Sequence, residues 1–393
     1  MSTLPSSNAS ARKGPLGLPI WNWLFPVLLW VFYFSEAVSK ISEWATGHYH
    51  PLPRWIKVGV IGFFFLVLIY YKFFKTLKVF AFLLLAFAIA NYSLGCDNPM
   101  ENVVVFGRYL FPIVLLFFFD ERVRAAVNLN ILYSSFEWLL KFNFVLIIIG
   151  LVFQVAIFET YDGPRFGYNG LLLTSSTSTY AYICALLYYC FKFNWRKEVL
   201  KDTGFWIVLV SSLLVGTKSL YLAVGMIFAF MVFLVVPPKK RLAFAISVGI
   251  IGSGLIYVIL NYLDPFKTIV EERGLLSAFL SYRNELVVRD VIPFIQAEWS
   301  WVNYLIGGVC DIKSRSEMAI IDVFYYWGIL GGCYYLYLFY KHLFSFKQDQ
   351  YTWFSLLLLF IVITLAGNFF FYSTIPIYIL LLRERILTSR EES

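Results

Sequence analysis

The chain has 393 residues, of which 60% are hydrophobic, 20% are aromatic and only 14% are charged. This composition excludes a water-soluble globule, because the polar residues are too few to cover a folded surface. The formal net charge of +8 would suit nucleic-acid binding, but the basic residues collect in short loops on one predicted side of a membrane. We therefore expect a polytopic membrane protein with no nucleic-acid partner.

The apolar runs are continuous over whole spans and do not alternate residue by residue, which predicts transmembrane helices. The expected fold class is all-α, a polytopic integral membrane protein with about twelve transmembrane helices. The predicted spans are 20–35, 56–71, 77–94, 102–119, 139–158, 172–191, 204–216, 219–236, 242–260, 316–340, 352–366 and 368–382.

Both ends of the chain are predicted to lie in the cytoplasm. Residues 1–19 are rich in Ser, Pro and Gly, and no small-residue cleavage site follows the first apolar run, so a tail is expected here and not a removable signal peptide. The transmembrane domain covers 20–382, and residues 383–393 form the second tail. The longer loops on the outer side are 36–55, 159–171 and 261–315.

The longest polar stretch runs from Asn261 to Gly331 and carries charges of both signs. It is too polar to cross a bilayer, so we expect its loop to lie outside the membrane and to hold the chemistry.

The five cysteines show no metal-binding spacing. Cys184, Cys190 and Cys333 lie in apolar runs, whereas Cys96 and Cys310 fall at predicted outer positions. A disulfide between these last two is one option, but nothing in the sequence determines their separation.

A glycine-rich turn, Gly163 to Asn169, presents Arg165 just before a span. A guanidinium held in this way can clamp a phosphate, or it can anchor the chain at the membrane interface. The span opens with a hydroxyl-rich run, 174–179, whose side chains are expected to bond mainly to their own helix backbone.

A second short outer turn, Gly216 to Ser219, keeps Lys218 close to the membrane surface. A cation at this depth is expected to be paired or to bind an anion. Snorkelling of the side chain to water is the alternative.

The long loop contains Arg283, Asn284 and Arg289 among apolar residues such as Leu280 and Val291, which favours an amphipathic helix lying on the membrane. The two arginines are six positions apart and point in different directions on a helix, so one can face the site and the other the headgroups. A merely solvated charged face is the alternative.

Two carboxylates, Glu317 and Asp322, stand at the outer end of a predicted span, just after Arg315. Carboxylates at this depth are costly unless they are used, and one of them could act as a general base. For Glu317 the alternative is a favourable interaction with a helix N-terminus. On a continuous helix Asp322 would lie about 140° around from Glu317, so the two could not face one pocket.

These residues resemble the superfamily of O-antigen polymerases (Wzy) and O-antigen ligases, bacterial envelope glycosyltransferases with arginine-rich periplasmic loops. The ligase motif has a histidine and a small polar residue, then nine positions, then Gly-x-x-Gly. Glu317, Met318 and the run from Gly328 to Gly331 match its spacing. Glu317 stands where the ligase histidine would be, which looks like the polymerase branch. The likeness covers about 150–340.

The resemblance implies a GT-C-like fold in the bacterial inner membrane, with the active site facing the periplasm. It also implies polymerisation of undecaprenyl-pyrophosphate-linked oligosaccharide into O-antigen or a related polysaccharide, without a metal or other cofactor. Membrane lipids and a chain-length regulator are the other candidate partners. The residues expected to act in catalysis are Glu317, as the base, with Arg283 and Arg289; those expected to bind pyrophosphate or glycan are Arg165, Lys218, Asn284, Arg315 and Asp322.

Two other functions stay open at this point. An O-antigen ligase would share the donor but should carry a histidine on the outer face, where the sequence has only His48 and His50, with His342 predicted to be cytoplasmic. A polysaccharide-precursor flippase would also have many spans, but it would place its charges within them.

Overall fold

The computed structural model describes residues 20–96, 99–120, 128–163, 165–262, 266–311, 315–372 and 374–391. Over these residues the protein is helical and contains no strand, apart from an isolated bridge between Glu159 and Tyr168. The expected all-α fold class is confirmed for this part of the chain. The N-terminal tail predicted over 1–19 lies outside the described residues.

Every predicted apolar run overlaps a helix. The helices concerned are α1 (Ile20–Thr46), α2 (Leu52–Tyr70), α3 (Phe74–Leu94), α4 (Pro99–Phe118), α5 (Leu129–Phe153), α6 (Ser175–Lys192), α7 (Thr203–Leu214), α8 (Lys218–Val235), α9 (Arg241–Tyr262), α14 (Ala319–Leu343), α15 (Gln350–Ala366) and α16 (Ile375–Glu391).

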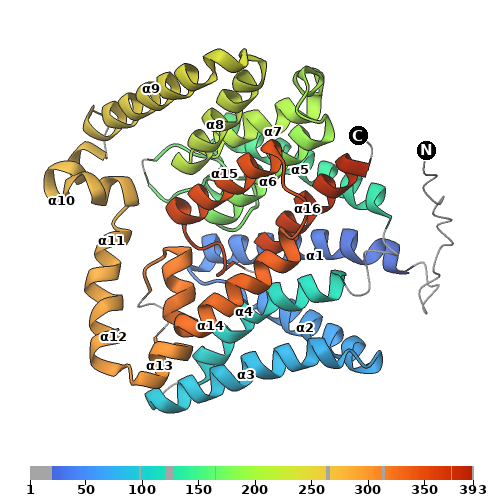
Figure 1. Cartoon of the computed structure of the whole chain (residues 1–393), viewed down its shortest axis with the longest axis vertical. Coiled ribbons are helices and arrows are strands. Elements are labelled where there is room, and N and C mark those ends of the chain that lie inside the picture. Colours follow the sequence, from blue (N-terminus) through green and yellow to red (C-terminus); the bar gives the residue numbers. More distant parts are fainter. Residues whose placement is uncertain are drawn as a thin grey trace.

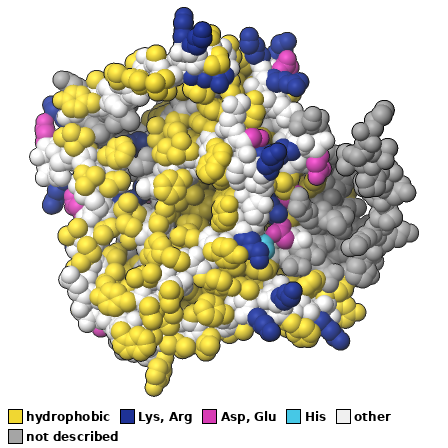
Figure 2. All heavy atoms as spheres, in the orientation of Figure 1, with side chains coloured by type: hydrophobic (Ala, Val, Ile, Leu, Met, Phe, Trp, Pro, Cys, Tyr) yellow, Lys and Arg dark blue, Asp and Glu magenta, His cyan; other side chains and the backbone are white. Residues whose placement is uncertain are grey.

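Seven of the described helices are long and apolar enough to cross a membrane. They are α1 to α5, α8 and α14, while α7 and the apolar part of α15 are shorter. Hydrophobic side chains cover most of the face shown in Figure 2, and charged side chains gather toward its edges. The protein is therefore a helical membrane protein, since no soluble fold would expose so wide an apolar surface.

The two ends of the helix bundle differ in structure (Figure 1). One end, which we call the loop end, carries α10 (Phe266–Leu280), α11 (Arg283–Leu286), the π-helical turn η5 (Val287–Val291), α12 (Ile292–Glu298) and α13 (Trp301–Ile306). The opposite end carries the last turns of α14 and α16. The helical character expected around 280–291 is thus confirmed, as α11 and η5.

Helix α6 forms the centre of the bundle. All of its residues from Thr177 to Phe191 are buried, and it packs on α16, α7, α8 and α15. This burial explains why α6 is less apolar than the outer helices: it faces protein on all sides, so small and hydroxyl side chains are accommodated by neighbouring helices.

Two helices extend beyond the apolar runs that predicted them. Helix α1 continues through the predicted loop to Thr46, because Glu36 and Lys40 are buried against protein and do not end the helix. Helix α16 continues to Glu391, through the segment assigned to a C-terminal tail, because Arg383 and Glu384 are also buried against neighbouring helices. Hydropathy marks the end of apolar sequence, whereas buried polar contacts decide where the helix ends.

A disulfide joins Cys96, after α3, to Cys310, after α13, with the two Cα atoms 5.2 Å apart. Of the two options that the sequence left open, the structure therefore contains the paired form. The bond ties α13 to the turn that follows α3, and α13 in turn packs on α14. It thereby restrains the loop end close to the candidate site.

Candidate functional site

Helix α14 breaks at Gly328, where φ is +66°. A Cβ atom at this position would lie 2.4 Å from the backbone nitrogen of Gly307, so only glycine allows the end of α13 to dock at the break. The backbone N–H of Gly308 donates a hydrogen bond of 3.1 Å to the carbonyl oxygen of Tyr326. The part of α14 that precedes Gly328 is therefore oriented by α13 and not by the rest of its own helix.

Asp322 lies in this first part of α14 and is 4% exposed. Its Oδ1 atom accepts hydrogen bonds from the Ser316 backbone N–H at 2.9 Å and from the Ser316 hydroxyl at 2.6 Å. Its Oδ2 atom is buried without a hydrogen-bond partner among the described residues. Asp322 also lines a small cavity of about 20 Å³ together with Arg315 and Tyr109, which is room for about one water molecule.

Glu317 precedes the helix and has a left-handed backbone, with φ at +57°. This conformation is uncommon for residues other than glycine and is often found at functional sites. The carbonyl oxygen of Glu317 packs so closely on Gly367 that a Cβ there would clash with it. Gly367 is itself held by a 2.8 Å hydrogen bond from the Tyr180 hydroxyl of α6. Three distant parts of the chain thus meet at Glu317.

We expected Glu317 and Asp322 to point away from each other on one helix, but the assumption that both belong to that helix is wrong. Helix α14 begins at Ala319 with Met318 as its N-cap, so Glu317 lies outside the helix and the helical angle does not apply to it. The two carboxylates are within electrostatic range of each other. They can therefore act at one site.

Arg283, at the start of α11, is the cation beside Glu317. Its Nε atom lies 3.4 Å from the position that a Cβ of Gly367 would occupy, on the same side as the Glu317 carbonyl. Burial lowers the pKa of the Arg283 guanidinium, and the charge of Glu317 opposes this effect. Arg283 is thus a partly desolvated cation next to the candidate base, as the sequence anticipated for one of the two loop arginines.

Arg315 and Arg108 both contact the ring of Phe371. Their Cζ atoms lie 3.6 Å and 4.2 Å from the ring centroid, so the ring supports two guanidinium groups that repel each other. The Nη1 atom of Arg315 is buried without a hydrogen-bond partner among the described residues. Arg108 was missed from the sequence, although an arginine inside an apolar run, here 102–119, is itself a signal of function.

Two more cations, Arg54 and Lys57 at the start of α2, lie close to Arg108. Arg108 is within electrostatic range of Arg54, and Lys57 is within range of Arg54, Arg108 and the buried Glu36. The predicted boundaries place Glu36 and Arg54 in an outer loop and Lys57 at the edge of a span. The fold gathers them because α1, α2 and α4 pack together.

The three other residues predicted to bind pyrophosphate or glycan are Lys218, Arg165 and Asn284, and two of them contact α10. The Lys218 ammonium donates hydrogen bonds to the Ala278 carbonyl oxygen at 3.1 Å and to the Ser281 hydroxyl at 3.0 Å, so it holds the end of α10. Arg165 is exposed over the ring of Tyr161, at 5.7 Å, and is within electrostatic range of Lys218. The Asn284 amide donates a 2.9 Å hydrogen bond to the Ser277 hydroxyl of α10.

Arg289 is placed differently from Arg283. Its side chain is 72% exposed and forms an ion pair with the neighbouring Asp290, with Nε and Oδ1 2.8 Å apart. The structure therefore brings Arg283 to the carboxylates and leaves Arg289 in solvent contact, in line with the different directions expected for the two arginines.

The hydroxyl-rich run at the start of α6 has a structural role. Thr174 caps the helix at the Thr177 backbone N–H, and the hydroxyls of Ser178 and Thr179 donate to carbonyl oxygens of the preceding turn. The expectation that these hydroxyls bond to their own helix is confirmed.

Lys40 holds the 159–171 segment in place. Its ammonium donates hydrogen bonds to the carbonyl oxygens of Glu159 and Gly170, at 3.1 and 2.8 Å, and to the Asn169 side chain at 2.5 Å. Sequence reasoning placed Lys40 in a loop and missed this contact, because its partners are far away in the chain. The segment that carries Arg165 is therefore anchored to α1.

Fold and site together define a helical membrane protein with a charged, partly buried site at its loop end. Among the described residues, no group of three or more His, Cys, Asp or Glu side chains is arranged to hold a metal ion. No family model, no curated protein and no solved structure matches the chain.

Proposed function

We propose that this protein is a membrane glycosyltransferase that polymerises oligosaccharide repeat units linked to a lipid pyrophosphate. The observation that carries the proposal is the gathering of two carboxylates with partly buried cations. Arg283 lies beside Glu317, and Arg315, which shares the Phe371 ring with Arg108, is within electrostatic range of Asp322. A reaction that needs both a base and stabilisation of a departing polyanion requires this combination.

In the proposed reaction, a sugar hydroxyl of the acceptor attacks the anomeric carbon of the donor. The bond from this carbon to the pyrophosphate oxygen breaks, and the electron pair leaves with the pyrophosphate. Glu317 accepts the proton of the attacking hydroxyl. The planar guanidinium of Arg283 stabilises the charge that develops on the leaving group, since it can donate two parallel hydrogen bonds to phosphate oxygens.

Asp322 is assigned a positioning role. Both of its hydrogen bonds go to Ser316, the residue before Glu317. They stabilise the turn in which Glu317 adopts its left-handed backbone. Loss of these bonds would let Glu317 move away from Arg283 without removing the base itself.

The orientation of the protein in the membrane is part of the proposal. The Cys96–Cys310 disulfide lies at the loop end, and disulfides persist in oxidising compartments such as the bacterial periplasm. The excess of Lys and Arg in loops at the opposite end supports the same orientation. The protein would thus lie in a bacterial inner membrane with its site facing the periplasm, where undecaprenyl-pyrophosphate-linked glycans would be the donors.

The position of His342 supports a polymerase more than a ligase. His342 lies near the end of α14 that is distant from Glu317, where its Nδ1 atom is 2.7 Å from the Asp120 carboxylate. It therefore cannot replace Glu317 in the candidate site. His48 and His50 lie in the exposed turn between α1 and α2.

A flippase remains a second candidate because of one observation. Glu36, Lys40 and Arg108 are charged residues inside helices that are long enough to cross the membrane, as in many transporters. A transport function requires that substrate pass from one face to the other, whereas a polymerase requires only that substrates reach the loop end.

Gene deletion followed by gel analysis of surface polysaccharide separates these functions. A product with a single repeat unit on lipid A indicates a polymerase, whereas loss of all repeat units indicates a ligase or a flippase. Purified protein in liposomes with lipid-linked repeat units on the loop-end side should then form a ladder of longer glycans. If no ladder forms but lipid-linked units move between leaflets, the polymerase proposal is wrong.

A further inference from the structure

A short hairpin, residues 159–170, connects α5 to α6 and carries one of the cations of the loop end. Glu159 and Tyr168 pair in its isolated antiparallel bridge. Its tip presents Arg165, whose Cζ atom lies 5.7 Å from the centroid of the Tyr161 ring. A hairpin of this length has no core of its own. Its position must therefore be set by the helices that it contacts.

Lys40 of α1 anchors one side of the hairpin. Lys40 is only 8% exposed, and its ammonium donates hydrogen bonds to the carbonyl oxygens of Glu159 and Gly170 and to the side chain of Asn169. An ammonium has three N–H donors, so all of them are used on the hairpin. A cation buried within an apolar helix is costly without such partners. The burial of Lys40 is therefore stable only while the hairpin is in place.

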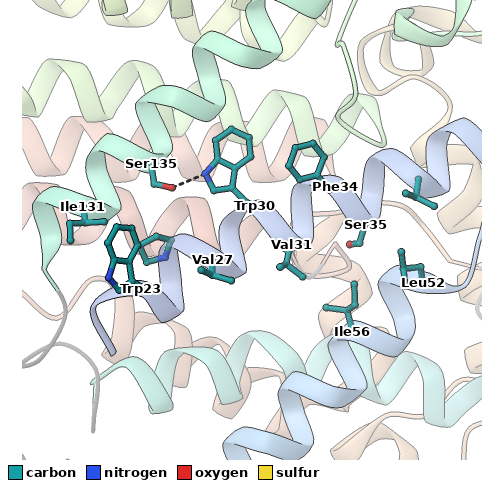
Figure 3. Close-up of a pocket in the computed structure, with 12 residues that line it drawn as sticks. Trp23, Val27, Trp30, Val31, Phe34, Ser35, Leu52, Ile56, Ile131 and Ser135 are labelled. Atoms are coloured by element: carbon teal, nitrogen blue, oxygen red, sulfur yellow. Dashed lines mark hydrogen bonds between the residues drawn. The ribbon is translucent and has the colours of Figure 1, made fainter. Parts of the chain in front are cut away.

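Helix α1 is a fixed support for this anchor, because it is bonded to α5. The two helices and α2 border an apolar groove along α1, and beside it the Trp30 indole donates a 2.9 Å hydrogen bond to the Ser135 hydroxyl of α5 (Figure 3). The Tyr33 hydroxyl donates a 2.7 Å hydrogen bond to the side chain of Asn143, also in α5. The amide of Asn143 in turn donates to the carbonyl oxygen of Asn169 at 3.1 Å. Helices α1 and α5 thus hold the hairpin together.

The other edge of the hairpin packs on the turn between α7 and α8. The Thr160 hydroxyl donates a 2.9 Å hydrogen bond to the Val215 carbonyl oxygen. A Cβ atom at Gly216 would lie 2.3 Å from the Phe166 carbonyl oxygen, so the two backbones touch at this glycine. The turn leads directly into α8, which begins at Lys218. The hairpin is therefore fixed on two sides, and one of them adjoins the candidate site.

These two anchors keep the tip of the hairpin beside the cations of the site. Lys218 is within electrostatic range of both Arg165 and Arg283, and Tyr161 is also within range of Arg283. Like charges repel one another, so electrostatics alone would move the tip away from Arg283. The position of Arg165 therefore depends on the contacts that hold the hairpin, above all on those of Lys40.

We infer that Lys40 is a positioning residue for the proposed reaction. By holding the hairpin, it keeps Arg165 beside Arg283, where the planar guanidinium of Arg165 binds a phosphate of the lipid-linked substrate. Lys40 itself is buried and acts only through Arg165. The inference rests on the proposed function for the identity of the substrate.

Spin labelling tests the position of the hairpin without any need for activity. A nitroxide is attached to Arg165→Cys in the full-length protein, after the exposed Cys333 has been replaced by serine. We expect an ordered electron paramagnetic resonance spectrum that becomes mobile when Lys40→Met is added. Lys192→Met is the matched control, because Lys192 bonds to Glu137 at the opposite end. A label that stays as ordered with Lys40→Met as without it would overturn the inference.

Kinetics distinguish positioning from a merely structural role. Arg165→Ala should raise the KM for lipid-linked repeat units about tenfold, equivalent to about 1.4 kcal/mol, with kcat little changed, because the phosphate contact is present before and during the reaction. Lys40→Met should raise the same KM by a similar factor. The double variant should be no worse than Arg165→Ala alone, because Lys40 acts through Arg165. An unchanged KM in Lys40→Met, or a rise of about a hundredfold in the double variant, would overturn the inference.

A milder variant keeps the test open if Lys40→Met does not insert. Asn169→Ala removes one of the three acceptors of Lys40 and leaves the lysine in place. It should raise the KM about threefold, as expected for one hydrogen bond, and should partly mobilise the label at Arg165→Cys. Asn128→Ala is its control, because it also loses a side-chain hydrogen bond, at the start of α5 at the opposite end. An Asn169→Ala variant with wild-type KM and an ordered label would refute the inference.

The outcomes for the hairpin and for the function can be separated. If Lys40→Met mobilises the label but the wild-type protein makes no polymer, the proposed function is wrong and only the anchoring of the hairpin stands. If the wild-type protein makes polymer and Lys40→Met does so with the same KM, the positioning role is wrong and the proposed function stands.

Discussion

Both ends of the bundle bury charged side chains, but they treat them differently. At the opposite end, Asp120 binds His342 at 2.7 Å and also Arg383, while Glu137 binds Lys192 at 2.7 Å. At the loop end, no ion pair within the described part of the chain joins the partly buried Arg108 or Arg315 to a carboxylate. The first arrangement joins helices, whereas in the second these cations have no carboxylate partner of this kind and, under the proposed function, would bind the pyrophosphate.

The difference has a physical reason. Burial of a charge near a membrane costs several kcal/mol unless a partner offsets it. At the opposite end the partners belong to the protein, so the charges contribute to a single packed state. At the loop end the cations repel one another and would be stabilised by an anion such as pyrophosphate. Substitutions at the two ends should therefore have different consequences.

Glu317→Gln should have the largest effect on activity. Glutamine keeps the size of the side chain but cannot accept the proton, so polymer formation should fall by about a hundredfold to ten-thousandfold. Lipid-linked repeat units should accumulate, which thin-layer chromatography would detect alongside a gel of the surface polysaccharide. Glu298→Gln, at the exposed end of α12, is the control.

Asp322→Asn should reduce polymer formation less than Glu317→Gln, because it weakens the hydrogen bonds to Ser316 and leaves the base in place. A dead Asn variant beside an active Gln variant would reverse the two assignments.

Asp120→Ala should show that the opposite end is structural. Removal of one partner of a buried ion pair costs about 3 kcal/mol or more, so the melting temperature in detergent should fall while the activity of the folded fraction is retained. Burial disfavours the charged form of Asp120, but the His342 hydrogen bond and the Arg383 charge outweigh it and lower its pKa.

The pH dependence of the protein's stability follows from the lowered pKa of Asp120. A carboxyl group with a lowered pKa stabilises the folded state at pH values above its unfolded pKa of about 3.9, and this contribution is lost as the pH falls through the folded pKa. The melting temperature of wild type should therefore fall more steeply below about pH 4 than that of Asp120→Ala. Parallel curves would show that the pair adds no stability.

Arg283→Ala should reduce polymer formation while the protein still inserts and folds. The loss of one preorganised donor to a developing anion typically costs about 2–4 kcal/mol of transition-state stabilisation. Arg283→Lys should recover little activity, because a point charge replaces a planar fork. Arg289→Ala should lose much less, since that side chain is exposed and paired with Asp290. Lys267→Ala on α10 is the control for a simple loss of surface charge. Equal losses from Arg283→Ala and Arg289→Ala would contradict the placement of the site.

Gly328→Ala should have a smaller effect that involves both fold and activity. The new Cβ would lie 2.4 Å from the Gly307 nitrogen in a backbone with φ at +66°, and such strain costs about 1–3 kcal/mol. Gly331→Ala is the matched control, because its Cβ would lie 3.3 Å from the Trp327 side chain. Thermal melts and gels of both variants would show whether the break in α14 matters. Equal melting temperatures and equal polymer formation in Gly328→Ala and Gly331→Ala would mean that the break is unimportant.

Cysteine labelling tests which compartment each end faces and should leave activity unchanged. An impermeant maleimide added to intact spheroplasts should label Glu272→Cys in α10 but not Lys240→Cys before α9, until the membrane is opened. The reverse pattern would invert the orientation and place the candidate site in the cytoplasm.

The sequence alone determined the class of protein and the approximate positions of its helices. Every predicted apolar run overlaps a helix, since a continuous apolar run has few alternatives to a helix in a bilayer. It also singled out Arg283 and Glu317, because charges beside apolar runs are conspicuous. The internal bonding of 174–179 was predictable as well, since it depends on near neighbours in the chain.

Only the tertiary structure decided which of these residues meet. Arg108 joins Arg315 because both contact Phe371, and Lys40 joins Glu159 across more than a hundred residues. Glu317 lies before the start of α14 and not within it, as its distance from Asp322 in the sequence had suggested, and its carbonyl oxygen packs on Gly367. The groove along α1 is likewise formed by α2 and α5 together. Local sequence carries hydropathy and spacing, whereas these features depend on contacts between segments that are distant in the chain.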